Sequence, residues 1–155
     1  MARIEQILEE KGIQLEKVPT PVAQYVPAKT VNNLVYTSGN DCRINGVLKY
    51  TGKVGKDLTV EQGYDAARQV MINLISVLKE HLGDLDRVKQ VVKMLAFVNS
   101  ADGFTHQPYV INGASDLLVE IFGEKGRHAR SAISANELPF DTPVEIELIV
   151  EIESE

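Results

Sequence analysis

The chain has 155 residues, of which 44% are hydrophobic and 25% are charged, proportions that suit a single soluble domain with its own core. The formal net charge of −6 disfavours nucleic acid as the main partner, because proteins that track phosphates usually present a basic face. No apolar run is long enough to cross a bilayer, and the N-terminus lacks the apolar core of a signal peptide. The single cysteine, Cys42, excludes an internal disulfide framework, so we expect a cytoplasmic protein.

The N-terminal segment predicts a short helix followed by a connector. Apolar residues recur at helical spacing over residues 2–11, and Gly12 is typical of a helix end. Two prolines then favour an extended chain. We therefore expect residues 1–21 to be an addition to a core formed by residues 22–155, within one domain that spans residues 1–155.

Two hairpins are predicted next. The segment Val22–Lys29 is expected to be extended, Asn32-Asn33 supplies a turn, and Leu34–Thr37 gives the second strand. Asn45-Gly46 is a stronger turn signal, so we expect a short polar hairpin around it.

Two amphipathic helices and a central strand follow. The first helix begins at a capping box of Thr59 and Gln62 and ends before Gly83, and the second begins near Pro108, a favoured first-turn residue. Between them, Val92–Val98 is apolar on both faces, as in a central strand. The two helices cover one face of such a sheet, so we expect self-association to cover the other.

The last two segments alternate with the period of a strand. The second is the clearer of the two, with its aliphatic residues on one face over Val144–Ile152 and its glutamates opposite. The order of elements predicts an α+β fold in which two helices pack on one face of a mixed sheet. If the two segments pair, Arg130 and Glu145 meet at one rim. Arg130 can hold a carboxylate bidentately and Glu145 can transfer protons, although a simple cross-strand ion pair is the structural alternative.

Other chemistry has little support in the sequence. It contains no P-loop and no nucleophile elbow, and none of the three histidines lies at metal-ligand spacing, so we expect no metal site. An RNA-cleaving enzyme would need His106 and His128 to meet across a cleft. Near the candidate pair, Tyr25 offers an amphipathic wall, and the Ser38-Gly39 turn offers exposed backbone N–H groups.

Six segments follow one another in a recognisable order: Tyr25-Val26, Tyr36–Gly39, Asn112, Ala129–Ser131, Leu138-Pro139 and Val144–Glu147. With these segments the chain resembles the Rid family, also called YjgF, from about Val22 to its C-terminus. The resemblance implies a chorismate-mutase-like fold and a homotrimer with a site in each cleft between subunits. It implies hydrolysis of reactive enamines and imines, such as 2-aminoacrylate, to 2-keto acids and ammonia without a cofactor.

The resemblance also assigns roles to single residues. Arg130 would grip the substrate carboxylate, and Glu145 would hold and activate the attacking water. Two positions depart from the family pattern, because Ala132 stands where well-studied deaminases have cysteine, and Ser115 where a tyrosine is frequent. A binding module for 2-keto acids, and the ribonuclease or translation inhibitor of older family names, are the alternatives. The implied substrate-binding residues are Arg130, Tyr25, Ser38, Gly39, Asn112 and Ala132.

Overall fold

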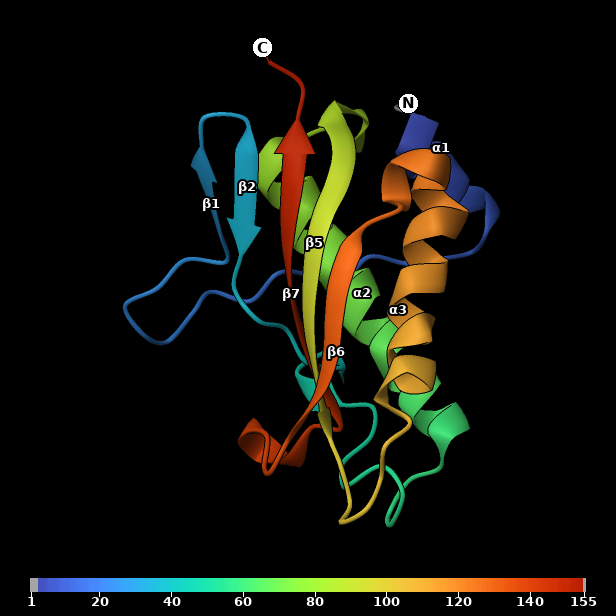
Figure 1. The fold of residues 1–155 in the computed structure, drawn as a ribbon. Helices are drawn as coiled ribbons and strands as arrows, with labels where there is room; N and C mark the ends of the chain where they lie inside the picture. The colour runs from blue at the N-terminus through green and yellow to red at the C-terminus, as the bar shows by residue number, and fades with distance from the viewer. Residues whose placement is uncertain (1–2, 155) are drawn as a thin grey trace.

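A five-stranded mixed sheet organises the chain, in the strand order β1-β2-β7-β5-β6 (Figure 1). The computed structural model describes residues 3–154. Neighbouring strands are antiparallel except β5 and β6, which are parallel. The strands of this sheet are β1 (Ala28–Val31), β2 (Leu34–Thr37), β5 (Val88–Asn99), β6 (Ala129–Ala135) and β7 (Val144–Ile152).

Three α-helices and a small hairpin complete the fold. The helices are α1 (Arg3–Glu10), α2 (Val60–Leu82) and α3 (Gln107–Phe122). The hairpin pairs β3 (Arg43–Ile44) with β4 (Val47–Leu48). The 3₁₀-helices are η1 (Leu85–Arg87), η2 (Gly123–Gly126) and η3 (Pro139–Asp141).

Local signals placed several of these elements correctly. The predicted capping box at the start of α2 is present, since the Gln62 amide donates to Thr59 Oγ1 at 3.1 Å and the Thr59 amide donates to Gln62 Oε1 at 2.9 Å. Asn45 and Gly46 both have positive φ, as the tight turn of the β3–β4 hairpin requires. The capping and turn predictions are therefore confirmed.

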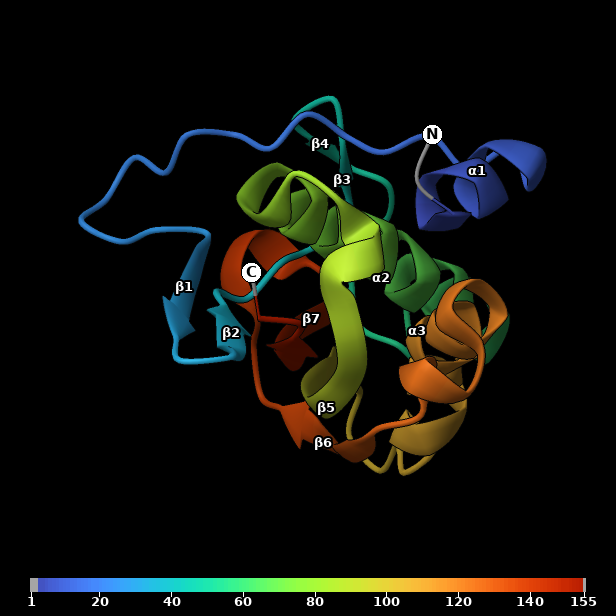
Figure 2. The ribbon, with the colours of Figure 1, turned by 90° about the horizontal axis from the view of Figure 1, so that it is seen from above.

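The core lies between the sheet and the helices α2 and α3. On β7 every second residue from Val144 to Ile152 is buried, and on β5 the buried face includes Met94, Ala96 and Val98. Figure 2 shows both helices on one side of the sheet, as predicted. Within residues 3–154, no helix combines the length and the apolar character that a membrane span needs.

The last two strands do not pair with each other, so the condition under which Arg130 and Glu145 would meet at one rim is not met. β5 lies between β6 and β7 and pairs with both. β6 is rich in alanine and serine and partly exposed, which suits an edge, whereas β7 is aliphatic and takes an inner position. The crossover from β5 through α3 brings β6 to one side of β5, and this leaves the other side for β7.

Two boundaries at the N-terminal end also differ from the prediction. The strand expected over Val22–Lys29 is only Ala28–Val31, because the chain before it runs as a loop away from the sheet edge, with Val22 fully exposed (Figures 1 and 2). The helix expected over residues 2–11 covers Arg3–Glu10. Parts of these predictions that concern residues 1, 2 and 155 fall outside the described residues.

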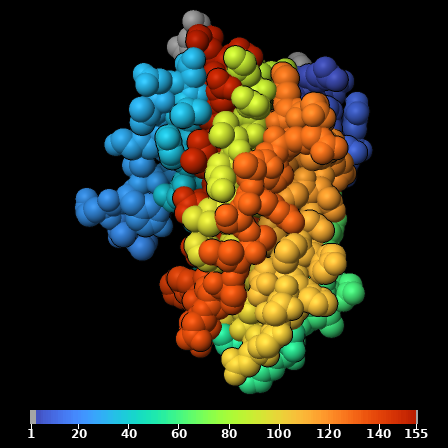
Figure 3. Space-filling model, in the orientation of Figure 1, coloured from blue at the N-terminus to red at the C-terminus, as the bar shows by residue number. Residues whose placement is uncertain are grey.

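The sheet face opposite the helices is uncovered in the single chain (Figure 3) and carries exposed apolar side chains. Tyr36 and Ile133 are 44% and 46% exposed there. Leu95, Phe97 and Ile149 lie on the same face and are half-buried. The register places them there, because it pairs Phe97 with Ile133 and Ile149 with Tyr36, and Leu95 is two positions before Phe97 in the same strand. An exposed apolar surface of this kind usually marks an interface.

Candidate functional site

The two charged residues singled out by the sequence lie on opposite faces of the sheet. Arg130 in β6 is level with Met94 of β5, and Glu145 in β7 is level with Phe97. Side chains alternate between the faces of a strand, and Met94 and Phe97 are an odd number of positions apart. Arg130 therefore points to the helix side, and Glu145 points to the open side. Within one chain they form two separate half-sites.

The Glu145 half-site is built against a glycine. An ideal Cβ on Gly39 would lie 2.8 Å from Glu145 Oε2, so only glycine lets the carboxylate lie this close to the backbone. The backbone bridge between Asn40 and Ile146 fixes the two segments beside each other. Burial of the carboxyl group raises the pKa of Glu145, and the negative charges of Asp41 and Glu147 raise it further.

The turn at Ser38, next to this half-site, is hydrogen-bonded to the segment before β1. The Ser38 hydroxyl donates to Val26 O at 2.6 Å, and the Ser38 amide donates to Pro27 O at 2.8 Å. The Ser38 amide is therefore not one of the exposed N–H groups that we expected from this turn. Tyr25 lies in the projecting loop and is 56% exposed.

A groove of about 830 Å³ lies beside the turn at Ser38 and Gly39, and Glu145 is not among the residues that line it. Its walls combine Tyr25, Ser38 and Gly39 with the N-terminal connector and with one side of α2. Asp41 and Arg43 add a joined pair of opposite charges, 3.0 Å apart at Oδ2 and Nε. The groove thus brings three of the predicted residues together, namely Tyr25, Ser38 and Gly39.

The Arg130 half-site lies between β6 and α3. Arg130 Nη1 donates to Ser115 Oγ at 3.0 Å, and Nη2 donates to Pro108 O at 3.3 Å. Asn112 precedes Ser115 by one helical turn, so both side chains share one side of α3. Ala132 shares the helix side of β6 with Arg130, because the two residues are two positions apart. The predicted residues thus divide into two groups of neighbours.

Sequence reasoning missed one residue of the Arg130 half-site. His128 Nε2 lies 2.9 Å from Ser115 Oγ, and His128 Nδ1 lies 2.6 Å from Gly126 O. In the sequence, His128 stands out only as a partner of His106 in a ribonuclease. Its position two residues before Arg130 in extended chain was the available signal, since that spacing places two side chains on one side.

The structure bears on two alternatives, an ion pair between Arg130 and Glu145 and an acid–base pair of His106 and His128. Neither Arg130 nor Glu145 forms an ion pair with any residue from 3 to 154, so the cross-strand ion pair was the wrong interpretation. His106 begins α3 and packs against Phe104 and Tyr109, with ring centroids 5.9 and 5.4 Å away. These contacts differ from those of His128 and provide no acid–base pair.

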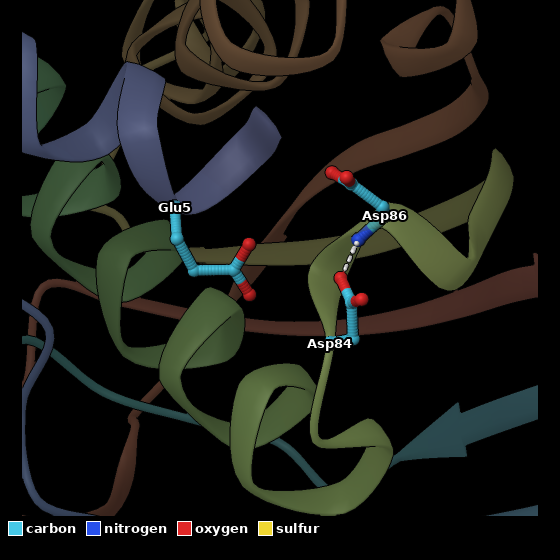
Figure 4. Close-up of side chains that lie close together, drawn as sticks. All are labelled: Glu5, Asp84 and Asp86. Atoms are coloured by element: carbon cyan, nitrogen blue, oxygen red, sulfur yellow. Dashed lines mark hydrogen bonds between the residues drawn. The ribbon is translucent and has the colours of Figure 1, made fainter. Parts of the chain in front are cut away.

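One cluster of carboxylates has the composition of a metal site. Glu5, Asp84 and Asp86 each place an oxygen within 4.8 Å of the others (Figure 4). All three already hold backbone groups, since Asp86 accepts from the first amides of α1, Asp84 from the Asp86 amide and Glu5 from the Leu85 amide. The cluster thus fastens α1 to the body, and no metal is needed to explain it.

The chain is similar in sequence and in structure to known proteins. Residues 5–152 match the family described as "YjgF/chorismate_mutase-like, putative endoribonuclease". Protein TCP17 of Trypanosoma cruzi is 43% identical, over 97% of this chain and 94% of its own. The crystal structure of Atu1372, a protein of unknown function from Agrobacterium tumefaciens, is 41% identical with a TM-score of 0.90, over 98% and 94% of the two chains.

A second solved structure is similar in shape over nearly the same length. The protein, described as a putative endoribonuclease from Shewanella oneidensis MR-1, is 35% identical with a TM-score of 0.93, over 96% of this chain and 99% of its own. The family match covers most of the chain, and the relatives are matched over nearly their full length. The chain therefore belongs to the YjgF/RutC family.

Proposed function

We propose that the protein is an enamine/imine deaminase that hydrolyses 2-aminoacrylate-type intermediates to 2-keto acids and ammonia. The observation that carries the proposal is the pair of half-sites: a guanidinium held in place by neutral partners, and a carboxylate with a raised pKa pressed against a glycine. The resemblance to the Rid family suggests the reaction class, and the two half-sites offer the groups that this reaction needs.

The chemistry assigns a separate task to each charge. Protonation of the enamine at its terminal carbon gives the iminium ion, and water then adds to the iminium carbon. Glu145 accepts a proton from that water, and a raised pKa makes a carboxylate a stronger base near neutral pH. Glu145 then returns the proton to the amine nitrogen, and the tetrahedral adduct expels ammonia and leaves the keto group as its hydroxyl gives up a proton. Arg130 holds the substrate carboxylate with two parallel hydrogen bonds, so that the imine carbon is fixed relative to the water.

A complete site needs a second subunit in this proposal. Arg130 and Glu145 lie on opposite faces of one sheet, so a single small substrate cannot contact both within one chain. We propose a homotrimer in which the Glu145 half-site of one subunit faces the Arg130 half-site of the next. The open apolar face around Phe97 and Ile133 supports this proposal, because a subunit interface would remove it from water.

The test couples the protein to a serine or threonine dehydratase that releases the enamine, and follows keto-acid formation. We expect acceleration over the spontaneous rate, and its loss in Arg130→Ala and in Glu145→Gln. Light scattering checks that both variants keep the wild-type mass. A wild-type protein that gives no acceleration contradicts the deaminase proposal.

Mixing the two inactive variants tests the shared site. In a hybrid trimer, one boundary between subunits joins an intact Glu145 to an intact Arg130. When the two variants are mixed at random in equal amounts, each subunit of a boundary carries the needed residue in half of the cases, so about a quarter of the wild-type sites are restored. The subunits are unfolded together and refolded to allow exchange. If each site lies within one chain, the mixture stays inactive.

The alternatives make different predictions in the same assay. A binding module for 2-keto acids would bind pyruvate through Arg130 without accelerating hydrolysis. A ribonuclease would cleave RNA in a manner abolished by substitution of His106 or His128. The engagement of His128 with Ser115 and Gly126 and the net charge of −6 favour the deaminase over the ribonuclease.

A further inference from the structure

A continuous chain of hydrogen bonds runs through the Arg130 half-site. Arg130 Nη1 lies 3.0 Å from Ser115 Oγ, Ser115 Oγ lies 2.9 Å from His128 Nε2, and His128 Nδ1 lies 2.6 Å from Gly126 O. The chain begins at the guanidinium and ends at a backbone carbonyl. It joins β6 to the middle of α3.

For a neutral His128 ring, the chemistry of the two ends gives every bond a direction. Gly126 O can only accept, so the proton on the His128 ring is at Nδ1. His128 Nε2 is then an acceptor, and the Ser115 hydroxyl donates to it. Arg130 can only donate, so it donates to a free lone pair of Ser115 Oγ. A neutral His128 in one tautomer satisfies all three bonds at once.

The end of the chain is a rigid anchor. Gly126 is buried, and an ideal Cβ on it would lie 2.2 Å from the backbone oxygen of Leu118 in α3. The segment before β6 therefore packs directly on the helix backbone. Gly126 thus packs closely on α3, its carbonyl bonds the His128 ring, and the ring in turn bonds the Ser115 hydroxyl.

We infer that Ser115 and His128 are positioning residues that orient the Arg130 guanidinium toward the carboxylate of a 2-imino or 2-keto acid. The inference rests on the proposed function, since it names the groups that prepare its carboxylate site. With one N–H of Nη1 given to Ser115 and one of Nη2 given to Pro108, Nε and the second N–H of each terminal nitrogen still offer a fork for a planar carboxylate.

This arrangement explains why serine at position 115 is compatible with the site. A serine hydroxyl accepts from Arg130 while it donates to His128, which a carboxylate or an aliphatic side chain cannot do. A role for Ser115 as a nucleophile is disfavoured, because a lone pair of its oxygen is already engaged by a guanidinium. The Ser115–His128 pair is thus a support for Arg130 rather than a second catalytic centre.

The experiment measures the Kd of pyruvate by calorimetry and, in the dehydratase-coupled assay, kcat and KM. We expect Ser115→Ala to raise Kd and KM about tenfold, the usual effect of losing one hydrogen bond to a charged group, with little change in kcat, because the carboxylate is bound equally before and during reaction. His128→Leu should weaken binding about threefold, by the partial loss of the same support.

Conservative variants separate positioning from packing. Ser115→Thr keeps the hydroxyl and should bind pyruvate more tightly than Ser115→Ala. His128→Gln keeps an acceptor near the Nε2 position and should bind more tightly than His128→Leu. Asp116→Asn, on the neighbouring exposed position of α3, is the control for disturbance of the helix.

The outcomes distinguish this inference from the proposed function. If the wild type binds pyruvate and Arg130→Ala does not, but Ser115→Ala keeps the wild-type Kd and KM, the inference fails alone. Equal loss in Ser115→Thr and Ser115→Ala also overturns it, because packing and not the hydroxyl would then be responsible. A wild type that neither binds pyruvate nor accelerates hydrolysis overturns both. Binding without acceleration removes only the deaminase.

Discussion

The contact between Gly39 and Glu145 offers the sharpest test of the Glu145 half-site. In Gly39→Ala, the new Cβ would lie 2.8 Å from Oε2 and 3.2 Å from the carboxyl carbon of Glu145. Gly39 does not have a positive φ, so alanine is compatible with its backbone. The substitution therefore acts on Glu145 and not on the turn.

The size of the effect follows from these distances. To reach the 3.4 Å of an ordinary contact, the carboxylate oxygen must withdraw by about 0.6 Å. A misplacement approaching 1 Å can lower a rate about 100-fold, so we expect kcat/KM to fall about 10- to 100-fold, or about 1.4 to 2.7 kcal/mol in the activation barrier. The displaced atoms belong to a flexible side chain, and alanine restricts the unfolded chain. We therefore expect the free energy of unfolding to stay within about 1 kcal/mol of wild type.

The assay is the dehydratase-coupled formation of keto acid, with thermal unfolding beside it. A Glu145→Asp background supplies the control, because the shorter side chain withdraws the carboxylate from Gly39 and relieves the clash. Gly39→Ala should then lower activity much less than it does in wild type, since contacting residues are not additive. Full activity in the single variant, or the same fold loss in both backgrounds, would refute the role of this contact.

Three further predictions concern stability. Glu145→Gln should stabilise the protein at pH 7–8 and not at pH 4. Burial raises the pKa of Glu145 above its ordinary value, so both states are protonated below the ordinary pKa, and the cost of the charged form to folding grows as the pH rises from the ordinary pKa through the raised one. Thermal unfolding against pH checks this, and equal gains at both pH values would contradict it. Asp86→Ala removes the acceptor of the first two α1 amides and should weaken α1 docking by about 1 kcal/mol, seen as faster hydrogen exchange in α1 alone. Gly113→Ala places a Cβ 2.0 Å from Tyr64 O and should destabilise the α2–α3 contact by about 3 kcal/mol in denaturant unfolding; a smaller change than 1 kcal/mol would show that the helices separate easily.

Elements whose signals lie within their own segment could be predicted from the sequence. The capping box at Thr59 needs only its own turn, and Asn45-Gly46 needs only its own hairpin. The alternation over Val144–Ile152 sets which face of β7 is buried. Such patterns depend on local geometry, so they hold whatever the rest of the chain does.

The order of the strands could not be predicted in the same way. Pairing depends on contacts between distant segments, and the alternation of β6 and β7 is compatible with several orders. With β5 between them, the predicted residues Arg130 and Glu145 keep their neighbours in sequence but lie on opposite faces. Local periodicity predicts which residues of a strand share a face. It does not predict which strands are neighbours in the sheet.

Ser115 illustrates a related limit. As a departure from the family pattern it indicated only that the pocket differs. Its partners are Arg130 in β6 and His128 just before that strand, both more than ten positions away along the chain. Their meeting depends on the close approach of Gly126 to α3, which a sequence does not display. The structure thus converts an unexplained substitution into a defined set of contacts.

The separation of Arg130 from Glu145 within one chain has an electrostatic consequence for the proposed reaction. Opposite unit charges 4 Å apart attract by about 4 kcal/mol at an effective dielectric constant of 20, and such a pair would lower the pKa of the carboxyl group. The pKa of Glu145 is instead raised, by burial and by the neighbouring carboxylates, and Arg130 donates to neutral oxygens. In the proposed trimer the substrate carboxylate binds Arg130 and shields it from Glu145. The base therefore keeps its proton affinity at the moment when water must be activated.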